Sequence, residues 1–277
     1  MSNSQVYPAY AASRVPHVGT YRRNLRVNLE RMYENALDWE HLPHVHADSF
    51  AGIDCIDSGD WGWRATLTDH GGGKSVVELA LDRDCGRWIT RTLSGPAQGS
   101  EIWTQVQVRT PTELTVVVDF FVPGIEPEQR EPVGAIYAEV YRRLYDEDEA
   151  MMIERQTQLE QRVQSTTQLE VKLPPLAQLQ LPHEFECAGR PCVLREEAGV
   201  LLAHPAACPH QLAPLRTAII EGGELRCPWH GYQFDLTTGA CTTGALCRLS
   251  PVLSVIESPT EVLVRAQSPE KSGEVLD

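Results

Sequence analysis

The pattern of apolar and polar positions predicts two helices with strands between and after them. Between Tyr21 and Leu42, apolar residues recur at spacings of three and four, which predicts one amphipathic helix. This helix should end near Pro43, because the residue before a proline disfavours helical backbone angles. A second helix is expected at 130–165. Its apolar stripe consists of Ile136, Val140, Leu144, Met151 and Met152.

Five stretches of strand character lie between the two expected helices, at 61–69, 75–82, 87–93, 101–109 and 113–122. Short turn segments such as "HGGGK", "DRDCG" and "SGPAQG" separate them, so consecutive strands should pair as an antiparallel meander. A curved antiparallel sheet that grips the second helix would bury its apolar stripe. We therefore expect an α+β fold whose N-terminal domain is of the helix-grip type.

The chain also divides into two domains. The stretch from 163 to 182, "VQSTTQLEVKLPPLAQLQLP", loses helical periodicity and contains three prolines, as is typical of a linker. The part after it consists of short strands and turns. We expect an N-terminal domain at 1–165, a linker at 166–182 and an all-β domain at 183–277.

Composition narrows the function classes. A length of 277 residues allows roughly two domains, each with its own core. The net charge of -14 disfavours binding to nucleic acid or to an anionic membrane. We find neither an apolar run of about 18 residues nor a secretory leader, and therefore expect a cytoplasmic protein without a membrane partner. In that compartment, eight cysteines indicate metal ligands or buried thiols rather than a disulfide framework.

The most specific motif lies in "CPHQLAPLRTAIIEGGELRCPWHG". It contains Cys208 and His210 and then, after sixteen residues, Cys227 and His230. This mixed order resembles the Rieske domain, in which two thiolates hold one iron of a [2Fe-2S] cluster and two imidazoles hold the other. A Cys2His2 zinc site is the alternative, but zinc fingers usually pair cysteine with cysteine and histidine with histidine. The resemblance implies that these four residues bind a Rieske cluster.

The residues around the motif are similar to the same family. The segments "APL", "GGELRCPWHGYQFDLTTG" and "LSPV" extend the resemblance over most of the C-terminal third. High-potential respiratory members carry an extra cysteine in each loop and a serine after the second histidine, where this chain has Ala213, Trp229 and Tyr232. The resemblance therefore implies the low-potential branch of oxygenases and ferredoxins. Four cysteines outside the motif are expected to be buried thiols: Cys187, Cys192, Cys241 and Cys247.

A second cluster of histidines lies in "NALDWEHLPHVH" at residues 35–46. Its Asp38-x-x-His41-x-x-x-x-His46 spacing is similar to the iron-binding motif of Rieske non-heme iron oxygenases, in which two histidines and a carboxylate hold Fe(II). Residues five apart point about 140° away from each other on an α-helix, so His41 and His46 can share a metal only if the helix is broken. Pro43 offers that break, and His44 is the reserve ligand. The plain alternative is a group of histidines that cap a helix end.

The carboxylate ligand is expected on the second helix, in "YRRLYDEDEAMMIERQ". Asp148 lies four residues after Leu144 and therefore on the buried stripe, where a carboxylate needs a partner. Asp146 points to the back of that helix, whereas Glu147 and Glu149 flank the stripe and should face solvent. The family also places its third ligand in an acidic cluster of this kind. A solvated acidic patch remains the alternative.

The resemblance also assigns roles to neighbouring residues. Asp38 should link the iron site to a cluster histidine and carry electrons between them, and Asn35 joins it among the expected catalytic residues. Family members usually place the Rieske domain first, whereas here it comes second, so the order is permuted and the catalytic domain is shorter. The family commonly forms head-to-tail trimers, and we expect a homo-oligomer with a trimer favoured.

These observations predict the terminal oxygenase component of a Rieske-type non-heme iron oxygenase. Its cofactors would be a [2Fe-2S] cluster and a mononuclear Fe(II), and it would use O2 to hydroxylate, demethylate or desaturate an apolar organic substrate, of a cyclic or aromatic kind. A ferredoxin or a flavin-dependent reductase would supply the electrons, because the chain lacks a GxGxxG-type nucleotide loop. The alternative is a non-catalytic Rieske electron carrier fused to a domain that binds a hydrophobic ligand.

Overall fold

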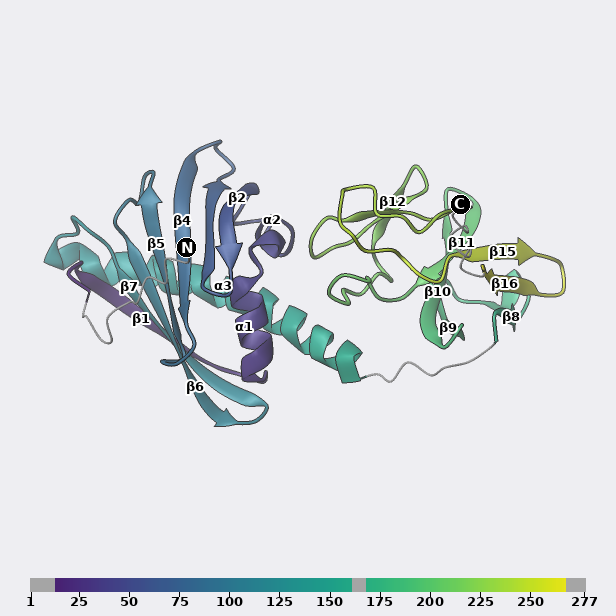
Figure 1. The fold of residues 1–277 in the computed structure, drawn as a ribbon, viewed down its shortest axis with the longest axis horizontal. Coiled ribbons are helices and arrows are strands. Elements are labelled where there is room, and N and C mark those ends of the chain that lie inside the picture. The colour runs from purple at the N-terminus through teal and green to yellow at the C-terminus, as the bar shows by residue number, and fades with distance from the viewer. Residues whose placement is uncertain (1–12, 161–167, 268–277) are drawn as a thin grey trace, which may run out of the picture. The chain divides into compact units, whose positions relative to one another are not determined.

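The structure, a computed structural model, describes residues 13–160 and 168–267 (Figure 1). The chain divides into two compact units, Met1–Ile153 and Glu154–Asp277. Each unit has its own sheets and its own hydrophobic core.

The N-terminal unit is built around one antiparallel sheet. Its strand order is β1-β7-β6-β5-β4-β3-β2, so each strand from β2 to β7 pairs with the next along the chain. The strands are β1 (His17–Leu25), β2 (Gly52–Gly59), β3 (Gly62–Thr68), β4 (Lys74–Asp82), β5 (Arg87–Ser94), β6 (Glu101–Thr110) and β7 (Glu113–Phe121). This arrangement confirms the expected meander.

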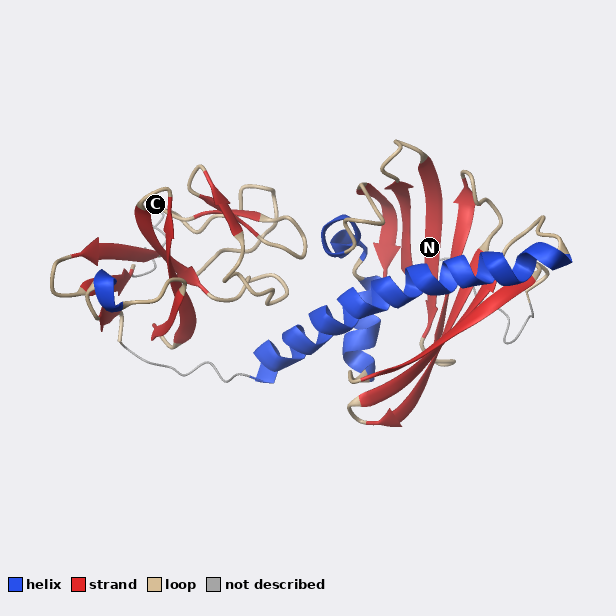
Figure 2. Ribbon diagram, turned by 180° about the vertical axis from the view of Figure 1, so that it is seen from behind, coloured by secondary structure: helices blue, strands red, loops and turns tan. Residues whose placement is uncertain are grey.

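The helices of this unit lie before and after the meander. They are α1 (Leu29–Leu37), η1 (Trp39–His41), α2 (Leu42–Val45), η2 (Pro127–Gln129) and α3 (Arg130–Glu160). Figure 2 shows α3 running across one face of the sheet. Phe120 on β7 is fully buried, and the rings of Tyr137 and Tyr141 on α3 lie 5.3 and 5.1 Å from its ring. The helix-grip interpretation of this unit is therefore confirmed.

The prediction of one helix between Tyr21 and Leu42 is wrong for the N-terminal part of that range. Residues from His17 to Leu25 form β1, which pairs with β7, and only Leu29–Leu37 form a regular helix. Buried and more exposed positions nearly alternate along β1, as is typical of a strand. The prediction missed this alternation because apolar spacings of three and four, which are typical of a helix, run from β1 into α1. The helix also ends at Leu37, before Pro43. Strand β2 was not predicted.

Helix α3 begins where expected and buries Asp148, Met151 and Met152 as predicted, but the stripe differs from the prediction at its N-terminal end. Ile136 is 66% exposed, although it was placed on the apolar stripe. The buried positions are Gly134, Tyr145, Asp148, Met151 and Met152. Gly134 allows the helix backbone to approach β1, since a Cβ there would come within 2.2 Å of the Val18 carbonyl oxygen. The end of the predicted helix, 161–165, lies outside the described residues.

The C-terminal unit consists of three small antiparallel sheets, ordered β11-β10-β9, β12-β13-β14 and β15-β16-β8. The strands are β8 (Glu170–Leu173), β9 (His183–Cys187), β10 (Arg190–Glu197), β11 (Val200–Pro205), β12 (Ile219–Glu221), β13 (Glu224–Arg226), β14 (Gln233–Asp235), β15 (Leu253–Glu257) and β16 (Val262–Ala266), and the one short helix described among them is η3 (Leu176–Gln178).

Part of the expected linker belongs to this second unit. Strand β8 falls within 166–182 but pairs with β16, where Val171 lies opposite Val264. Leu173 is buried in the same core as Val262 and Leu253. The expected linker therefore extends too far, because residues from Glu170 onward belong to the sheet and core of the second unit.

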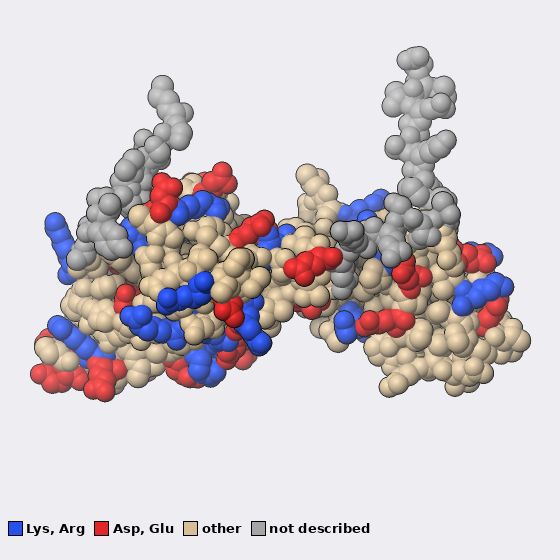
Figure 3. Space-filling view, turned by 90° about the horizontal axis from the view of Figure 1, so that it is seen from below, with Lys and Arg blue, Asp and Glu red and all other residues tan. Residues whose placement is uncertain are grey.

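The molecule as described is an α+β protein with a β-rich C-terminal part. No helix in the described ranges combines the length and the apolar character needed to cross a membrane. On the face seen in Figure 3, acidic and basic side chains of the N-terminal unit are mixed rather than gathered by sign.

Candidate metal sites

A break at Asp38 and a change from 3-10 helix to α-helix after His41 precede His46 in the chain. Helix α1 ends at Leu37, and Asp38 leaves the helical region with φ -82° and ψ 81°. A turn of 3-10 helix then leads to His41, and α2 starts with Pro43 in its first turn, where proline is tolerated because no helical donor is lost. His46 follows as the C-cap of α2. Pro43 thus begins a helix rather than ending one.

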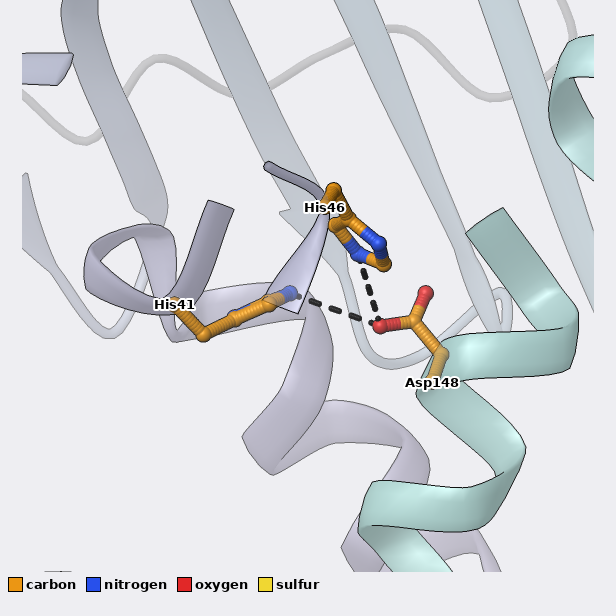
Figure 4. A group of neighbouring side chains, drawn as sticks. All are labelled: His41, His46 and Asp148. Atoms are coloured by element: carbon orange, nitrogen blue, oxygen red, sulfur yellow. Dashed lines mark hydrogen bonds and ion pairs between the residues drawn. The ribbon is translucent and has the colours of Figure 1, made fainter. Parts of the chain in front are cut away.

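Asp148 on α3 meets both histidines inside the N-terminal unit (Figure 4). Its Oδ1 lies 3.0 Å from Nε2 of His46 and 3.4 Å from Nε2 of His41. The two histidines are 2% and 3% exposed, and Asp148 is 9% exposed. Among the described residues, this is the one group of three or more potential metal ligands whose ligand atoms converge, all within 4.8 Å of one another.

The electrostatics of this group favour a cation. Burial alone would lower the pKa of His41, but the carboxylates of Asp148 and Asp38 outweigh burial and raise it to about 10. Burial alone would raise the pKa of Asp148, but the two imidazoles hold it well below its usual range. Neither ring nitrogen of His41 makes a hydrogen bond of good geometry within the described chain. A buried carboxylate beside two imidazole nitrogens is a donor set that suits a divalent metal.

Asn35 and Asp38, both expected at this site, border the three converging residues. Asn35 donates a hydrogen bond of 2.9 Å from Nδ2 to Oδ1 of Asp148 and so orients that carboxylate. Asp38 is buried, with Oδ2 at 3.7 Å from Nδ1 of His41. His44, the reserve ligand, is half-buried and does not belong to the converging group.

Glu147 is a site residue that the sequence interpretation missed. It was expected to face solvent, but its Oε2 lies 2.6 Å from Nδ1 of His46. Consecutive residues of α3 therefore contact the two nitrogens of one imidazole, Glu147 at Nδ1 and Asp148 at Nε2. Glu149 was also expected to face solvent, but it bonds Arg23 at 2.6 Å and is mostly buried. No sequence signal reveals these partners, because they come from segments about a hundred residues away.

The three residues line a cavity between the sheet and the helices of the N-terminal unit. It encloses about 730 Å³, including its mouth. Most of its wall is apolar: Met32, Trp63, Leu79, Trp88, Tyr141 and Leu144 all contribute. The indole N–H of Trp63 is already bonded to the carbonyl of Ala36 at 3.0 Å, so that ring presents apolar surface.

The C-terminal motif forms two loops of the same construction. In the first loop, the amide of Leu212 donates to the carbonyl of Cys208 at 3.0 Å, and in the second, the amide of Gly231 donates to that of Cys227 at 3.0 Å. Leu212 and Gly231 each follow the cysteine by four residues, and both have a positive φ, 63° and 67°. Each cysteine amide in turn donates to the carbonyl of the residue five positions later. The same turn is thus built twice, once around each Cys/His pair.

The loops bring together a pair of thiols and a pair of imidazoles. Cys208 and Cys227 are buried and close enough to share a proton: the hydrogen bond between them raises the pKa of Cys208 and lowers the pKa of Cys227. The rings of His210 and His230 lie 4.6 Å apart. Two thiols beside two imidazoles form the donor set of a Rieske cluster, in which the thiolates hold one iron and the imidazoles the other.

Comparison with known proteins identifies the class of this second site. The family model of the Rieske [2Fe-2S] domain matches residues 170–251, a range that contains all four predicted ligands. The chain therefore carries a Rieske [2Fe-2S] domain, placed after an N-terminal domain of helix-grip fold.

Individual relatives agree with this assignment. The 4beta-methylsterol monooxygenase of Methylococcus capsulatus is 44% identical over 50 residues, which are 18% of this chain and 13% of that protein. The oxygenase component of dicamba O-demethylase from Stenotrophomonas maltophilia is 46% identical over 41 residues, 15% of this chain and 12% of that protein. The chain thus spans only about an eighth of the length of these curated relatives.

A ferredoxin is among the similar solved structures. The ferredoxin of carbazole 1,9a-dioxygenase from Nocardioides aromaticivorans is 30% identical and covers 35% of this chain and 98% of its own, with a TM-score of 0.29.

Proposed function

We propose that this chain is the terminal oxygenase component of a Rieske-type non-heme iron oxygenase. One observation carries the proposal. A chain that contains a Rieske domain also holds two buried histidines and a buried aspartate that converge at the wall of an apolar cavity. A Rieske cluster moves single electrons, and a second metal site in the same chain gives those electrons a destination.

The residues of the N-terminal site fit Fe(II). His41 and His46 would bind it through Nε2, and Asp148 would supply the carboxylate. Iron held on one side by two histidines and a carboxylate supplies open positions where O2 and a substrate meet. Asn35 holds Asp148 in place, and Glu147 accepts the Nδ1–H of His46, which leaves Nε2 of that ring for the metal.

The cavity supports an apolar organic substrate. Aromatic and aliphatic side chains form most of its wall, and its lining among the described residues includes no Lys or Arg. An anionic substrate would lose its hydration there without a Lys or Arg partner in the lining. Hydroxylation, demethylation or desaturation of a neutral ring compound is the reaction class that we propose.

The remaining partners follow from the same proposal. Electrons would reach the cluster from a ferredoxin or a flavin-dependent reductase, and Asp38 would lie on the path from the cluster to the iron. We propose a homo-oligomeric and cytoplasmic protein, with a trimer favoured because relatives of this class commonly assemble in that way. The alternative is a Rieske electron carrier whose N-terminal unit only binds a hydrophobic ligand.

Single-turnover oxidation of the reduced cluster tests the electron path. Asp38→Asn keeps the shape of the side chain but replaces one acceptor oxygen by an NH2 donor. Protein reduced under argon would be mixed with O2 and a panel of neutral ring compounds, and the cluster absorbance followed. We expect Asp38→Asn to retain both metals but to reoxidise its cluster much more slowly than wild type.

The control is Asp146→Asn, an exposed change on α3, which should react at the wild-type rate. Wild-type rates in Asp38→Asn would remove Asp38 from the path. Asp148→Ala gives the second comparison. If the cluster of wild type is oxidised no faster than the cluster of this variant with any compound of the panel, the electron-carrier alternative is favoured.

A further inference from the structure

Two cysteines that do not belong to the cluster motif lie opposite each other in the C-terminal unit. Cys241 and Cys247 were expected to be buried thiols, but both are only partly buried. An antiparallel bridge joins Ala240 to Arg248. Cys241 follows Ala240 and Cys247 precedes Arg248, so this bridge brings the two cysteines close to each other at the base of a loop. The five residues between the two cysteines form a hairpin loop.

The span between the two residues suits a disulfide. Opposed residues of an antiparallel pair have Cα atoms about 4.5–5.5 Å apart, and disulfides form where Cα atoms are about 4.4–6.8 Å apart. The two thiols already contact each other through a hydrogen bond, and Sγ of Cys241 also lies 3.3 Å from Oγ1 of Thr243. Closure would therefore require little movement of the backbone.

The two thiols differ in reactivity. Partial burial opposes ionisation of Cys241, but hydrogen bonds with Thr243 and Cys247 outweigh it and lower the pKa of its thiol. Burial and the neighbouring Cys241 raise the pKa of Cys247. Cys241 is thus the thiol that more readily becomes a nucleophilic thiolate, and Cys247 is placed to react with it afterwards.

A second pair in the same unit shows the opposite character. Cys187 and Cys192 are 2% and 0% exposed, and burial raises the pKa of Cys192 to about 12. Buried thiols that remain protonated react poorly, so this pair offers a control within the same fold.

We propose that Cys241 and Cys247 are a reversible modification site, oxidised to a disulfide by hydroperoxides. The Cys241 thiolate attacks one oxygen of hydrogen peroxide, the O–O bond breaks, and a sulfenic acid and hydroxide form. The Cys247 thiol then attacks that sulfur, the S–S bond forms, and its proton leaves with the departing oxygen as water. In sum, two thiols and one hydrogen peroxide give one disulfide and two waters, and a reducing dithiol restores the thiols by exchange.

The site is connected to the cluster loops through the backbone. The amide of Thr242 donates to the carbonyl of Gln233 at 2.8 Å, and Gln233 directly follows Tyr232, whose carbonyl accepts from the cluster ligand Cys227 at 2.8 Å. Leu246 at the tip of the hairpin is fully exposed. A disulfide would close the loop of this exposed hairpin, whose first arm is hydrogen-bonded to the strand that follows the second cluster loop.

Peptide mapping of the holoprotein tests this proposal. Protein purified under argon would receive one equivalent of hydrogen peroxide, then iodoacetamide, while the visible absorbance reports the cluster. Trypsin leaves Cys227, Cys241 and Cys247 on one peptide, so cleavage after Phe234 and after Leu246 is needed to put the last two on separate peptides. We expect these two peptides to remain joined, with a loss of 2 Da, and dithiothreitol to separate them.

Four variants control the result. Cys241→Ser and Cys247→Ser should each abolish the joined peptides, whereas Cys187→Ser and Cys192→Ser should leave them unchanged. The proposal is overturned if both thiols are alkylated after peroxide treatment while the cluster stays intact. It is equally overturned if the cluster bleaches before any joined peptide forms, because the thiols would then not be the preferred target.

Discussion

His46 lies between two carboxylates that come from consecutive positions of one helix. Glu147 contacts Nδ1 at 2.6 Å and Asp148 contacts Nε2 at 3.0 Å, while the imidazole itself is 2% exposed. A histidine that binds a metal through one nitrogen usually donates the N–H of the other to such a partner. Glu147 therefore acts as a positioning residue, which sets the tautomer and the orientation of the ring.

Removing this partner should weaken the metal site without destroying it. We expect Glu147→Ala to lower the affinity for Fe(II) about 10- to 100-fold, the range typical of such outer partners. The affinity of Glu147→Gln for Fe(II) should lie between that of Glu147→Ala and that of wild type, because the amide oxygen of glutamine still accepts a hydrogen bond. Competition with a chelator, followed on protein with an intact cluster, measures the affinity. Asp146→Asn is the matched control, and equal affinity in all four proteins would contradict the role of Glu147.

His204 on β11 should make the C-terminal unit sensitive to acid. Burial lowers the pKa of this histidine to about 4, below its ordinary value near 6.5. The unfolded chain therefore binds a proton on His204 more tightly than the folded chain does. The contribution of neutral His204 to the free energy of unfolding is complete above pH 6.5 and is lost as the pH falls from 6.5 to 4. The loss amounts to about 3 kcal/mol at most.

His204→Met removes the titrating group and keeps a similar volume. We expect the unfolding temperature of the wild-type C-terminal unit, read from the visible circular dichroism of the cluster, to fall more steeply between pH 6.5 and 4 than that of the variant. Parallel curves for the two proteins would show that His204 does not titrate as described.

At the scale of elements, the contact between α3 and β1 depends on one glycine. A Cβ at Gly134 would lie 2.2 Å from the carbonyl oxygen of Val18 and 3.1 Å from the Cα of Gly19. Alanine is favoured over glycine within a helix by about 1 kcal/mol, but overpacking of a core contact typically costs about 1–3 kcal/mol. The clash involves backbone atoms, which move less easily than a side chain.

We therefore expect Gly134→Ala to destabilise the N-terminal unit, although alanine has the higher helix propensity. Urea unfolding followed by tryptophan fluorescence measures this, since Trp39, Trp61, Trp63, Trp88 and Trp103 all lie in that unit and only Trp229 does not. An unchanged or raised midpoint would show that β1 and α3 are not in such close contact.

The elements also show what could be predicted from the sequence. Strands β3 to β7 were found within one residue, because short turn segments separate consecutive strands. Asp148 was found as well, because a carboxylate in register with apolar residues on a helix needs a partner. Strand β1 was missed, because its pattern merges with that of α1. Glu147 was missed since its partner comes from a segment 101 residues away.

At the scale of the whole molecule, each site is built within one unit. The residues of the proposed iron site lie between 35 and 148, and the proposed cluster ligands lie between 208 and 230, on either side of the division at 153. The Rieske domain comes after the helix-grip domain, whereas relatives of the proposed class usually have the reverse order. Separate cores imply that a ligand removed from one site should leave the other site intact.

The ratio of iron to acid-labile sulfide in anaerobically purified protein tests the central proposal most directly. Wild type should contain about three irons and two sulfides per chain, with two irons in the cluster and one outside it. His46→Ala and Asp148→Ala should each reduce this to about two irons and two sulfides, with an unchanged Rieske EPR spectrum on reduction, whereas His44→Ala should keep the third iron. A wild-type protein that never holds more than two irons per two sulfides, after expression and reconstitution with Fe(II), would contradict the oxygenase proposal and favour an electron carrier.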